Sequence, residues 1–180
     1  TFLKYDEVPR VLLALGGKWQ AIVATAVYTG LRRGEIFALR KSDIDWEEQT
    51  LQVCKSWEAD STKDGKAALI PIADGLVPFL KAAAKASPSK YLFPRPDGAM
   101  HDREVNADRN LHNALGRAGV VEGYEHRCRK QGCGFKELRP TADHGKCPKC
   151  KRSLWPVAIP RHVRFHDLRH TTATLLLKEG

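Results

Sequence analysis

Apolar side chains recur at helical spacing in the N-terminal part of the chain. In YDEVPRVLLAL, residues 5–15, they fall three and four positions apart, which predicts an amphipathic helix that ends before Gly16. The next stretch, KWQAIVATAVY, is apolar on nearly every side and predicts a buried helix that ends at Gly30. RRGEIFALR then predicts a third helix. The inward positions expected of the first helix are Val8, Val11, Leu12 and Leu15.

The middle of the chain changes to strand patterns and then returns to helical ones. TLQVCKSWE and KAALIPI predict two strands, with Asp64-Gly65 as a hairpin turn between them. GLVPFLKAAAKA predicts a helix, SPSKYLFPRPDGAM a loop, and DREVNADRNLHNALGRAG a helix closed by Gly119. This order of elements predicts an α+β fold that is mostly helical with a small antiparallel sheet.

The segment from residue 122 to residue 160 has a different composition. Cysteine, glycine, proline and basic residues dominate it, and helical periodicity is lost. We interpret it as an insertion that divides one core into residues 1–121 and 161–180.

Four cysteines in this insertion have the spacing of a metal site. The pattern is C-x4-C, thirteen intervening residues, then C-x2-C, and two close pairs can present four thiolates to one tetrahedral Zn²⁺. Such a zinc would be structural, because protein ligands fill every position. Two disulfides or four unrelated thiols would fit the same spacing. The predicted ligands are Cys128, Cys133, Cys147 and Cys150, whereas His126 and His144 are expected to be bystanders and Cys54 a core residue.

The charge of the chain is strongly positive. Its formal net charge is +9 and its isoelectric point is about 9.5, which favours a polyanionic partner such as nucleic acid, although a merely basic surface would show the same excess. A zinc bound by four thiolates would lower the charge to about +7. No apolar run has bilayer-spanning length and no signal segment is present, so we expect a cytoplasmic, nucleoid-associated protein, where disulfides are disfavoured.

Basic side chains stand at three positions suited to a phosphate. Arg32 lies at a predicted helix start, where a forked guanidinium adds to the positive end of the helix dipole. Lys63 adjoins the predicted hairpin turn, and His166 and Arg169 lie three residues apart on one helical face. Each has an ordinary structural explanation when taken alone.

Taken together and in this order, they resemble the catalytic domain of the tyrosine recombinases, or phage integrase family. TGLRRGEIFALR, TKDGKAALIPI and HDLRHTTATLLLKEG are similar to the first arginine box, the hairpin lysine and the His-x-x-Arg box of that family. The resemblance runs from about residue 2 to residue 180, the insertion excepted, and implies an integrase-like catalytic core. The insertion is unusual for the family.

The resemblance implies DNA strand breakage and rejoining through a phosphotyrosyl intermediate, with no cofactor for catalysis. Arg32 and Arg169 would hold the non-bridging phosphate oxygens. Lys63 would protonate the leaving 5′-oxygen, and His166 would handle the proton of the tyrosine or orient the phosphate. Glu35 would hold Arg32 in place, and His170 would brace the site.

One family feature does not occur in these residues. The nucleophilic tyrosine follows the His-x-x-Arg box in the family, whereas all four tyrosines here precede it. We therefore expect a fragment or natural truncation that does not cleave DNA by itself and is a monomer, cut from a protein that binds duplex DNA as a homotetramer. A non-catalytic DNA-binding protein that keeps the phosphate pocket is the alternative, and the zinc ribbon could instead be a protein-docking module. The tyrosines are Tyr5, Tyr28, Tyr91 and Tyr124.

Overall fold

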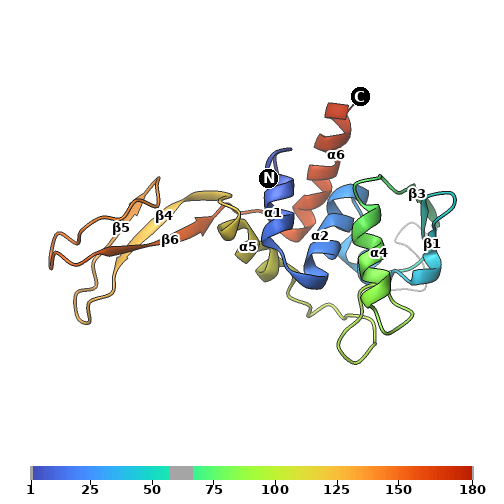
Figure 1. Ribbon diagram of the computed structural model, residues 1–180, viewed down its shortest axis with the longest axis horizontal. Coiled ribbons are helices and arrows are strands. Elements are labelled where there is room, and N and C mark those ends of the chain that lie inside the picture. Colours follow the sequence, from blue (N-terminus) through green and yellow to red (C-terminus); the bar gives the residue numbers. More distant parts are fainter. Residues whose placement is uncertain (1, 57–66, 180) are drawn as a thin grey trace.

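The computed structural model describes residues 2–56 and 67–179 and has two visibly different parts. Helices and a small sheet form a rounded core, and a second, long sheet projects from it along the longest axis of the molecule (Figure 1). We call this projection, residues 121–160, the arm. The core and the small sheet confirm the predicted mostly helical α+β fold.

Six α-helices build the described core. Among the described residues, no helix combines the length and apolar character needed to cross a lipid bilayer. Short 3-10 segments, Lys41–Asp43 and Phe165–Asp167, precede β1 and α6. The helices are α1 (Glu7–Ala14), α2 (Gly17–Thr29), α3 (Arg33–Ala38), α4 (Val77–Ala86), α5 (Ala107–Arg117) and α6 (Leu168–Glu179).

The helix predictions hold with one correction. The helix α1 ends before Gly16, and α2 is buried along most of its length and ends at Gly30, which has φ +65°. The helix α5 begins at Ala107, five residues later than the pattern at Asp102 predicted. The side chain of Asn106 accepts a hydrogen bond from the backbone N–H of Arg109, 3.0 Å away, and this N-cap fixes the start.

The core sheet is antiparallel, with the order β1-β2-β3. Two strands, β2 (Thr50–Val53) and β3 (Ala68–Pro71), lie within the predicted segments, and β1 (Ile44–Asp45) was not predicted because two residues give no readable alternation. The predicted turn Asp64-Gly65 lies outside the described residues. Cys54 lies beyond the end of β2 and is only half-buried, so the expectation of a core residue was wrong.

The helix α2 is the centre of the core. It contacts α1, α3, α4 and α6, and its residues from Ala21 to Val27 are all buried. The predicted inward residues of α1 are buried as well, as is Leu80 of α4. Burial of each large aliphatic side chain contributes about 1.5–3 kcal/mol, so these helices are held chiefly by apolar packing.

The arm is a three-stranded antiparallel sheet with the order β5-β4-β6. Its strands are β4 (Val121–Cys128), β5 (Lys136–Arg139) and β6 (Leu154–Pro160). A register shift between Val121 and Gly123 marks the point where β4 leaves the core. Figure 1 shows the arm extending away from α5, so both of its faces are turned to solvent over most of its length.

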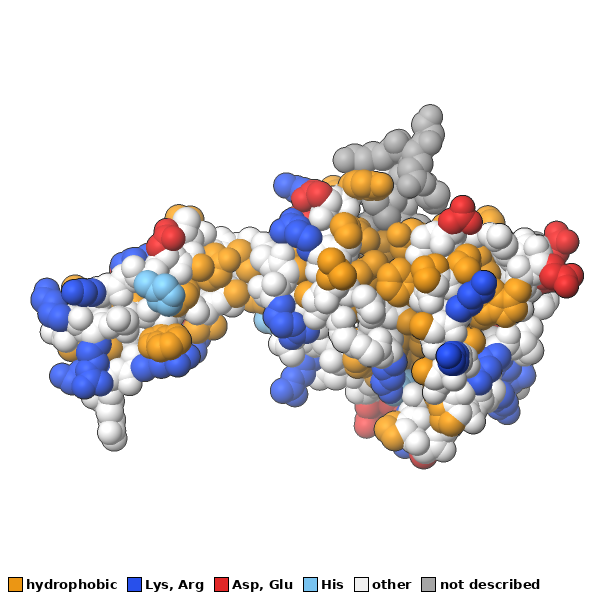
Figure 2. All heavy atoms as spheres, in the orientation of Figure 1, with side chains coloured by type: hydrophobic (Ala, Val, Ile, Leu, Met, Phe, Trp, Pro, Cys, Tyr) orange, Lys and Arg blue, Asp and Glu red, His pale blue; other side chains and the backbone are white. Residues whose placement is uncertain are grey.

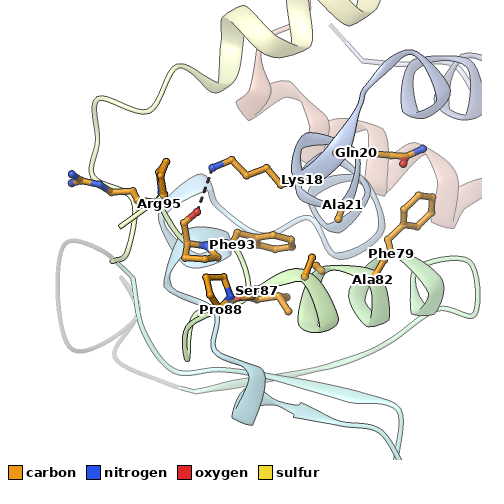
Figure 3. Close-up of a pocket in the computed structure, with 15 residues that line it drawn as sticks. Lys18, Gln20, Ala21, Phe79, Ala82, Ser87, Pro88, Phe93 and Arg95 are labelled. Atoms are coloured by element: carbon orange, nitrogen blue, oxygen red, sulfur yellow. Dashed lines mark hydrogen bonds between the residues drawn. The ribbon is translucent and has the colours of Figure 1, made fainter. Parts of the chain in front are cut away.

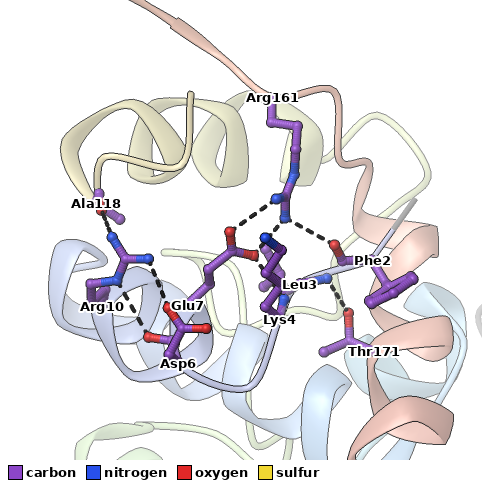
Figure 4. Close-up of polar contacts among 9 residues, drawn as sticks. All are labelled: Phe2, Leu3, Lys4, Asp6, Glu7, Arg10, Ala118, Arg161 and Thr171. Atoms are coloured by element: carbon purple, nitrogen blue, oxygen red, sulfur yellow. Dashed lines mark hydrogen bonds and ion pairs between the residues drawn. The ribbon is translucent and has the colours of Figure 1, made fainter. Parts of the chain in front are cut away.

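The root of the arm is fastened to the N-terminal segment of the core. Arg161 directly follows β6, and its guanidinium donates to both carboxylate oxygens of Glu7, at 2.9 and 2.6 Å, and to the carbonyl oxygen of Phe2 at 2.9 Å (Figure 4). The backbone N–H of Leu3 donates to Thr171 Oγ1 on α6, 3.0 Å away. The N-terminal segment thus joins the root of the arm to α6.

Candidate functional site

Arg32 is held at the start of α3 by a buried carboxylate. Its backbone N–H donates to Glu35 Oε2 at 2.7 Å, and its Nη1 lies 3.1 Å from Glu35 Oε1. The Glu35 side chain is only 7% exposed, whereas that of Arg32 is 40% exposed. The expected support of Arg32 by Glu35 is therefore present, and the guanidinium remains accessible to a phosphate.

The end of α2 lies against the first turns of α6. Thr172 donates through its hydroxyl to the carbonyl oxygen of Val27 at 2.7 Å. A Cβ atom at Gly30 would lie 3.4 Å from Thr172 Oγ1, and the left-handed φ of +65° at Gly30 also favours glycine. Arg32 follows Gly30 by two residues and Arg169 precedes Thr172 by three, so two candidate arginines come from segments that touch.

Asp108 links the two candidate motifs from a third element. One carboxylate oxygen accepts from the backbone N–H of Phe165 at 2.7 Å, and the other lies 3.8 Å from Arg33 Nη1. Phe165 begins the 3-10 turn that carries His166, and Arg33 begins α3. Sequence reasoning missed Asp108, because its place in the first turn of α5 is explained equally well by the helix dipole.

The turn before α6 fixes the His-x-x-Arg motif. Asp167 is buried and accepts from the backbone N–H of Arg164 at 3.0 Å. Burial alone would raise the pKa of Asp167, but hydrogen bonds and charge from Arg164 outweigh it and hold that pKa below its usual value. His166 and His170 are exposed and Arg169 is half-buried. Lys63, the remaining candidate, lies outside the described residues.

Two of the carboxylates near this arrangement are occupied by the groups that they hold, whereas Asp108 is exposed beside Arg33. The carboxylates of Glu35 and Asp167 are both buried and turned to the backbone and arginines that they hold. Two guanidiniums and an imidazole on adjoining segments can hold a phosphodiester and neutralise the charge of its transition state. Nothing in their chemistry requires a metal at this point.

A separate hollow of about 540 Å³ lies between the start of α2, α4 and the loop after it. Its walls are mainly apolar, with Ala21, Phe79 and Phe93 among them, and Lys18 bridges its rim to the carbonyl oxygen of Pro94 at 3.3 Å (Figure 3). No candidate catalytic residue of the described chain lines this hollow. Its apolar lining does not suit a phosphate, so we do not place the site there.

The four predicted cysteine ligands meet near the far end of the arm. Their Sγ atoms all lie within 4.8 Å of one another. The separations are 3.4 Å for Cys128 and Cys150 and 3.7 Å for Cys133 and Cys147. Four sulfurs about 2.3 Å from one tetrahedral Zn²⁺ would be roughly 3.8 Å apart. The set therefore fits a Zn²⁺ ion without rearrangement of the backbone.

Tight turns direct backbone amides toward these sulfurs. Gly132, which precedes Cys133, and Lys151, which follows Cys150, adopt left-handed φ values of +76° and +62°. Each residue allows the chain to turn tightly beside a cysteine. The N–H of Arg152 donates to the Cys150 sulfur and is the main reason that the pKa of this thiol falls to about 7. The lowered pKa favours the ionised form of the Cys150 thiol. A thiolate is the form that binds a metal.

The two histidines of the arm are not members of this cluster. His126 is buried and its Nε2 lies 2.9 Å from the carbonyl oxygen of Thr141. The ring of His144 meets that of Trp155 edge to face, with centroids 6.5 Å apart. Neither belongs to the four-residue set within ligand distance, in keeping with their expected role as bystanders.

Comparison with known proteins relates the chain to the phage integrase family. The sequence matches the phage integrase family over residues 1–134, a range that includes Arg32 and ends within the arm. It is 27% identical over 176 residues to a XerC-like tyrosine recombinase of Caldanaerobacter subterraneus subsp. tengcongensis, covering 97% of this chain and 43% of that protein.

Two solved structures share the fold. One is XerA recombinase, with a TM-score of 0.64 and 23% identity over 100% of this chain and 52% of that one. The other is a lambda integrase dimer bound to a COC′ core site, with a TM-score of 0.61 and 18% identity over 99% of this chain and 53% of that one. The chain thus spans about half the length of these proteins or less. Because the family match takes in residues 1–134 of 180, this chain belongs to the phage integrase family of tyrosine recombinases.

Proposed function

We propose that this chain is the phosphate-binding part of a site-specific recombinase that breaks and rejoins DNA through a phosphotyrosyl intermediate. The observation that carries the proposal is the contact of Gly30 with Thr172, which brings the segment of Arg32 to the helix of Arg169. The anchoring of Arg32 by Glu35 supports it, since a fixed guanidinium makes a better transition-state contact than a mobile one.

Each candidate residue has a distinct part in the proposed reaction. Arg32 and Arg169 bind the non-bridging oxygens of the scissile phosphate and neutralise charge as a tyrosine oxygen attacks phosphorus. His166 accepts the tyrosine proton or orients the phosphate. Lys63 donates a proton to the leaving 5′-oxygen, so the P–O bond breaks without release of a strong base. A second 5′-hydroxyl then reverses the step.

The proposed nucleophile lies outside residues 1–180. Tyr5 and Tyr28 line a hollow formed by α1, α2 and α4, and Tyr124 lies in the arm. We propose that none of the four attacks DNA, that residues 1–180 bind duplex DNA as a monomer, and that a longer protein assembles on DNA as a homotetramer.

The proposed cofactor is one structural Zn²⁺ bound by the four arm cysteines, with no cofactor for catalysis. Their mutual distances support it. Elemental analysis of protein purified without added metal tests it and should find about one zinc per chain. Protein that contains no metal, or that contains disulfides between the cysteines under reducing conditions, would contradict this part of the proposal.

A nicked suicide substrate tests the reaction. Residues 1–180 should form no covalent adduct, and protein extended to a tyrosine after Gly180 in its parent gene should form one. Arg169→Ala in the extended protein should abolish the adduct, and Arg169→Lys should also be poor, because an ammonium cannot make the forked contact.

The same experiment separates the proposal from its alternative. An extended protein that binds duplex DNA but forms no adduct would be a non-catalytic DNA-binding protein. Adduct formation by residues 1–180, or an extended protein indifferent to Arg32 and Arg169, would overturn the assignment of the pocket.

A further inference from the structure

Unpaired positive charge is concentrated at the far end of the arm. We define the tip as residues 128–135 and 144–153, which surround the four cysteines. The tip contains no acidic residue, and the nearest one along the chain, Asp143, lies just outside it. Figure 2 shows Lys and Arg side chains gathered at this end of the molecule. Its exposed cations are Arg129, Lys130, Lys146, Lys149, Lys151 and Arg152.

The cations nearer the core have acidic partners within the arm. Glu125 pairs with Arg127 and lies 4.0 Å from Lys136, and Glu137 pairs with Arg139. Within the part of the chain that the structure describes, none of the six tip cations makes an ion pair. Even with a bound Zn²⁺ and four thiolates the tip keeps a net charge of about +4. This positive charge therefore favours binding of an anion from outside the chain.

The tip also presents a charged surface where an apolar one would otherwise be exposed. The guanidinium carbon of Arg129 lies 4.1 Å from the ring centre of Trp155, so the cation covers the largest apolar group of this region. The exposed Leu138 and Val157 lie on β5 and β6, on either side of Glu125 of β4 in the register and closer to the core. A polyanion therefore suits the tip better than an apolar protein face.

The arm holds its tip at a fixed distance from the core. Its root is clamped by the Arg161–Glu7 pair, whose side chains are 25% and 8% exposed. The eight residues of β4 span roughly 27 Å at a strand rise of about 3.4 Å. Phosphates of one DNA strand follow one another at about 3.4 Å along the helix axis, so this reach corresponds to roughly 8 base pairs.

We propose that the tip of the arm is a second DNA-binding surface, which contacts the phosphate backbone of the same duplex several base pairs away from the site formed by Arg32 and Arg169. This inference rests on the proposed binding of duplex DNA by the core. The contact is independent of sequence, because lysine and arginine side chains on mobile stems recognise phosphate rather than base edges. The four cysteines would fix the turns from which these side chains project once the proposed Zn²⁺ is bound.

Equilibrium binding of residues 1–180 to a 30-base-pair duplex, followed by fluorescence anisotropy over a range of salt concentrations, tests the proposal. The tip variant combines Lys130→Gln, Lys149→Gln and Arg152→Gln. The control variant combines Lys81→Gln, Lys85→Gln and Lys90→Gln, which removes the same charge from the region of α4. Zinc content of the tip variant confirms that its arm is folded.

The tip variant should bind on the order of 10-fold or more weakly near 0.1 M salt, and its slope of log affinity against log salt should fall by about 2 to 3, because each lost phosphate contact lowers it by about 0.9. The control variant should change little in both. Reductive methylation of lysines followed by mass spectrometry should show protection of Lys146, Lys149 and Lys151 by the duplex, and none of Lys81 and Lys85.

The outcomes separate this inference from the proposed function. If the unaltered chain does not bind the duplex at low salt, DNA binding by the core fails and the inference fails with it. If the chain binds but the two variants weaken binding equally, the effect is general charge and the tip has no special role. If binding persists and the tip lysines are labelled as fast with DNA as without, the partner of the tip is not DNA.

Discussion

The core and the arm of this molecule differ in how much apolar surface they bury. The core buries a continuous set of apolar side chains around α2, with Phe37, Ile22 and Leu111 at no exposure at all. Among the described residues of the arm, the only apolar side chains buried to this degree are Cys147 and Leu154. A sheet with so little buried apolar surface is not stable in isolation, so we infer that a metal replaces packing as its source of stability.

With the proposed Zn²⁺, one chain could carry a long extension without a second hydrophobic core. A zinc bound by four thiolates contributes about 10–16 kcal/mol in small zinc-finger peptides, which exceeds the gain from several buried leucines. The ion pair between Arg161 and Glu7 and the packing of α5 against β6 then join the arm to the core. With the proposed Zn²⁺ bound, packing in the core and coordination in the arm could be disrupted separately.

Removal of the metal should produce the largest difference in stability between the arm and the core. After treatment with a strong chelator we expect the arm to unfold, while the helical signal of the core persists, because the core does not depend on the metal. Limited trypsin digestion should then cut first between residues 127 and 152, where lysine and arginine are dense. Circular dichroism checks the helices in the same sample.

Cysteine variants provide the matched control for this experiment. Cys147→Ser should lose zinc and become as sensitive to trypsin as the chelated protein, whereas Cys54→Ser should keep about one zinc per chain, since Cys54 lies outside the cluster. An arm that resists trypsin after all zinc has been removed would show that coordination is not what holds it.

The two regions also differ in how much of them the sequence predicts. Helical spacing placed α1, α2 and α4 correctly because their burial repeats along the chain. The start of α5 was misplaced, because the capping by Asn106 is a local contact that competes with the upstream pattern. The cysteine spacing predicted the cluster in the arm but not its strands, where the pattern alternates weakly.

The candidate residues of the site can be read from the sequence, but the long-range contacts that position them cannot. The motifs at Arg32 and Arg169 can be read from the sequence, and so can Glu35, which lies three residues after Arg32 at a helix start. The contacts of Asp108 with Phe165 and of Thr172 with Val27 cannot, since they join residues far apart in the chain. No local pattern records such long-range pairs.

Truncation of one leucine in each region tests whether the core and the arm are stabilised independently, with a smaller expected effect. Leu111 and Leu154 are both fully buried, the first in the core and the second in the arm. Leu111→Ala should lower the free energy of unfolding of the core by about 2–5 kcal/mol and leave zinc affinity unchanged. Leu154→Ala should weaken zinc binding and change core unfolding by less than about 0.5 kcal/mol. Denaturant unfolding and a zinc competition assay measure the two effects.

Acid should loosen the junction between the two regions. Burial alone would raise the pKa of Glu7, but its hydrogen bonds with Arg161 and the backbone of Lys4 hold the folded value below 4.5. The stability contributed by this carboxylate is therefore fully present above pH 4.5 and is lost as the pH falls through the lowered value. Glu7→Gln should cost about 1.5–3 kcal/mol at pH 7, and less as the pH falls through the lowered pKa of Glu7.

Denaturant unfolding at pH 7, 5 and 3.5 checks this prediction. Asp6→Asn is the control, because Asp6 is 73% exposed in its pair with Arg10 and such pairs contribute about 0–1 kcal/mol. An equal cost of Glu7→Gln at all three pH values would mean that the ionised carboxylate is not what stabilises the junction.

The smallest effect is expected where an aromatic ring and a cation meet at the tip. Arg129 stacks on Trp155, which is 46% exposed, so the contact is only partly screened by water. At such a site a cation–π contact contributes about 0.5–1 kcal/mol. A double-mutant cycle with Arg129→Met and Trp155→Leu measures this contact through zinc affinity. The coupling between the two substitutions should be about 2- to 5-fold in zinc affinity, because the contact helps to position the strand that follows Cys150. Methionine keeps much of the length of arginine without its charge, so the cycle isolates the cation. Coupling near zero would mean that zinc alone orders the tip, and that Arg129 is as free to reach a phosphate as the other five cations.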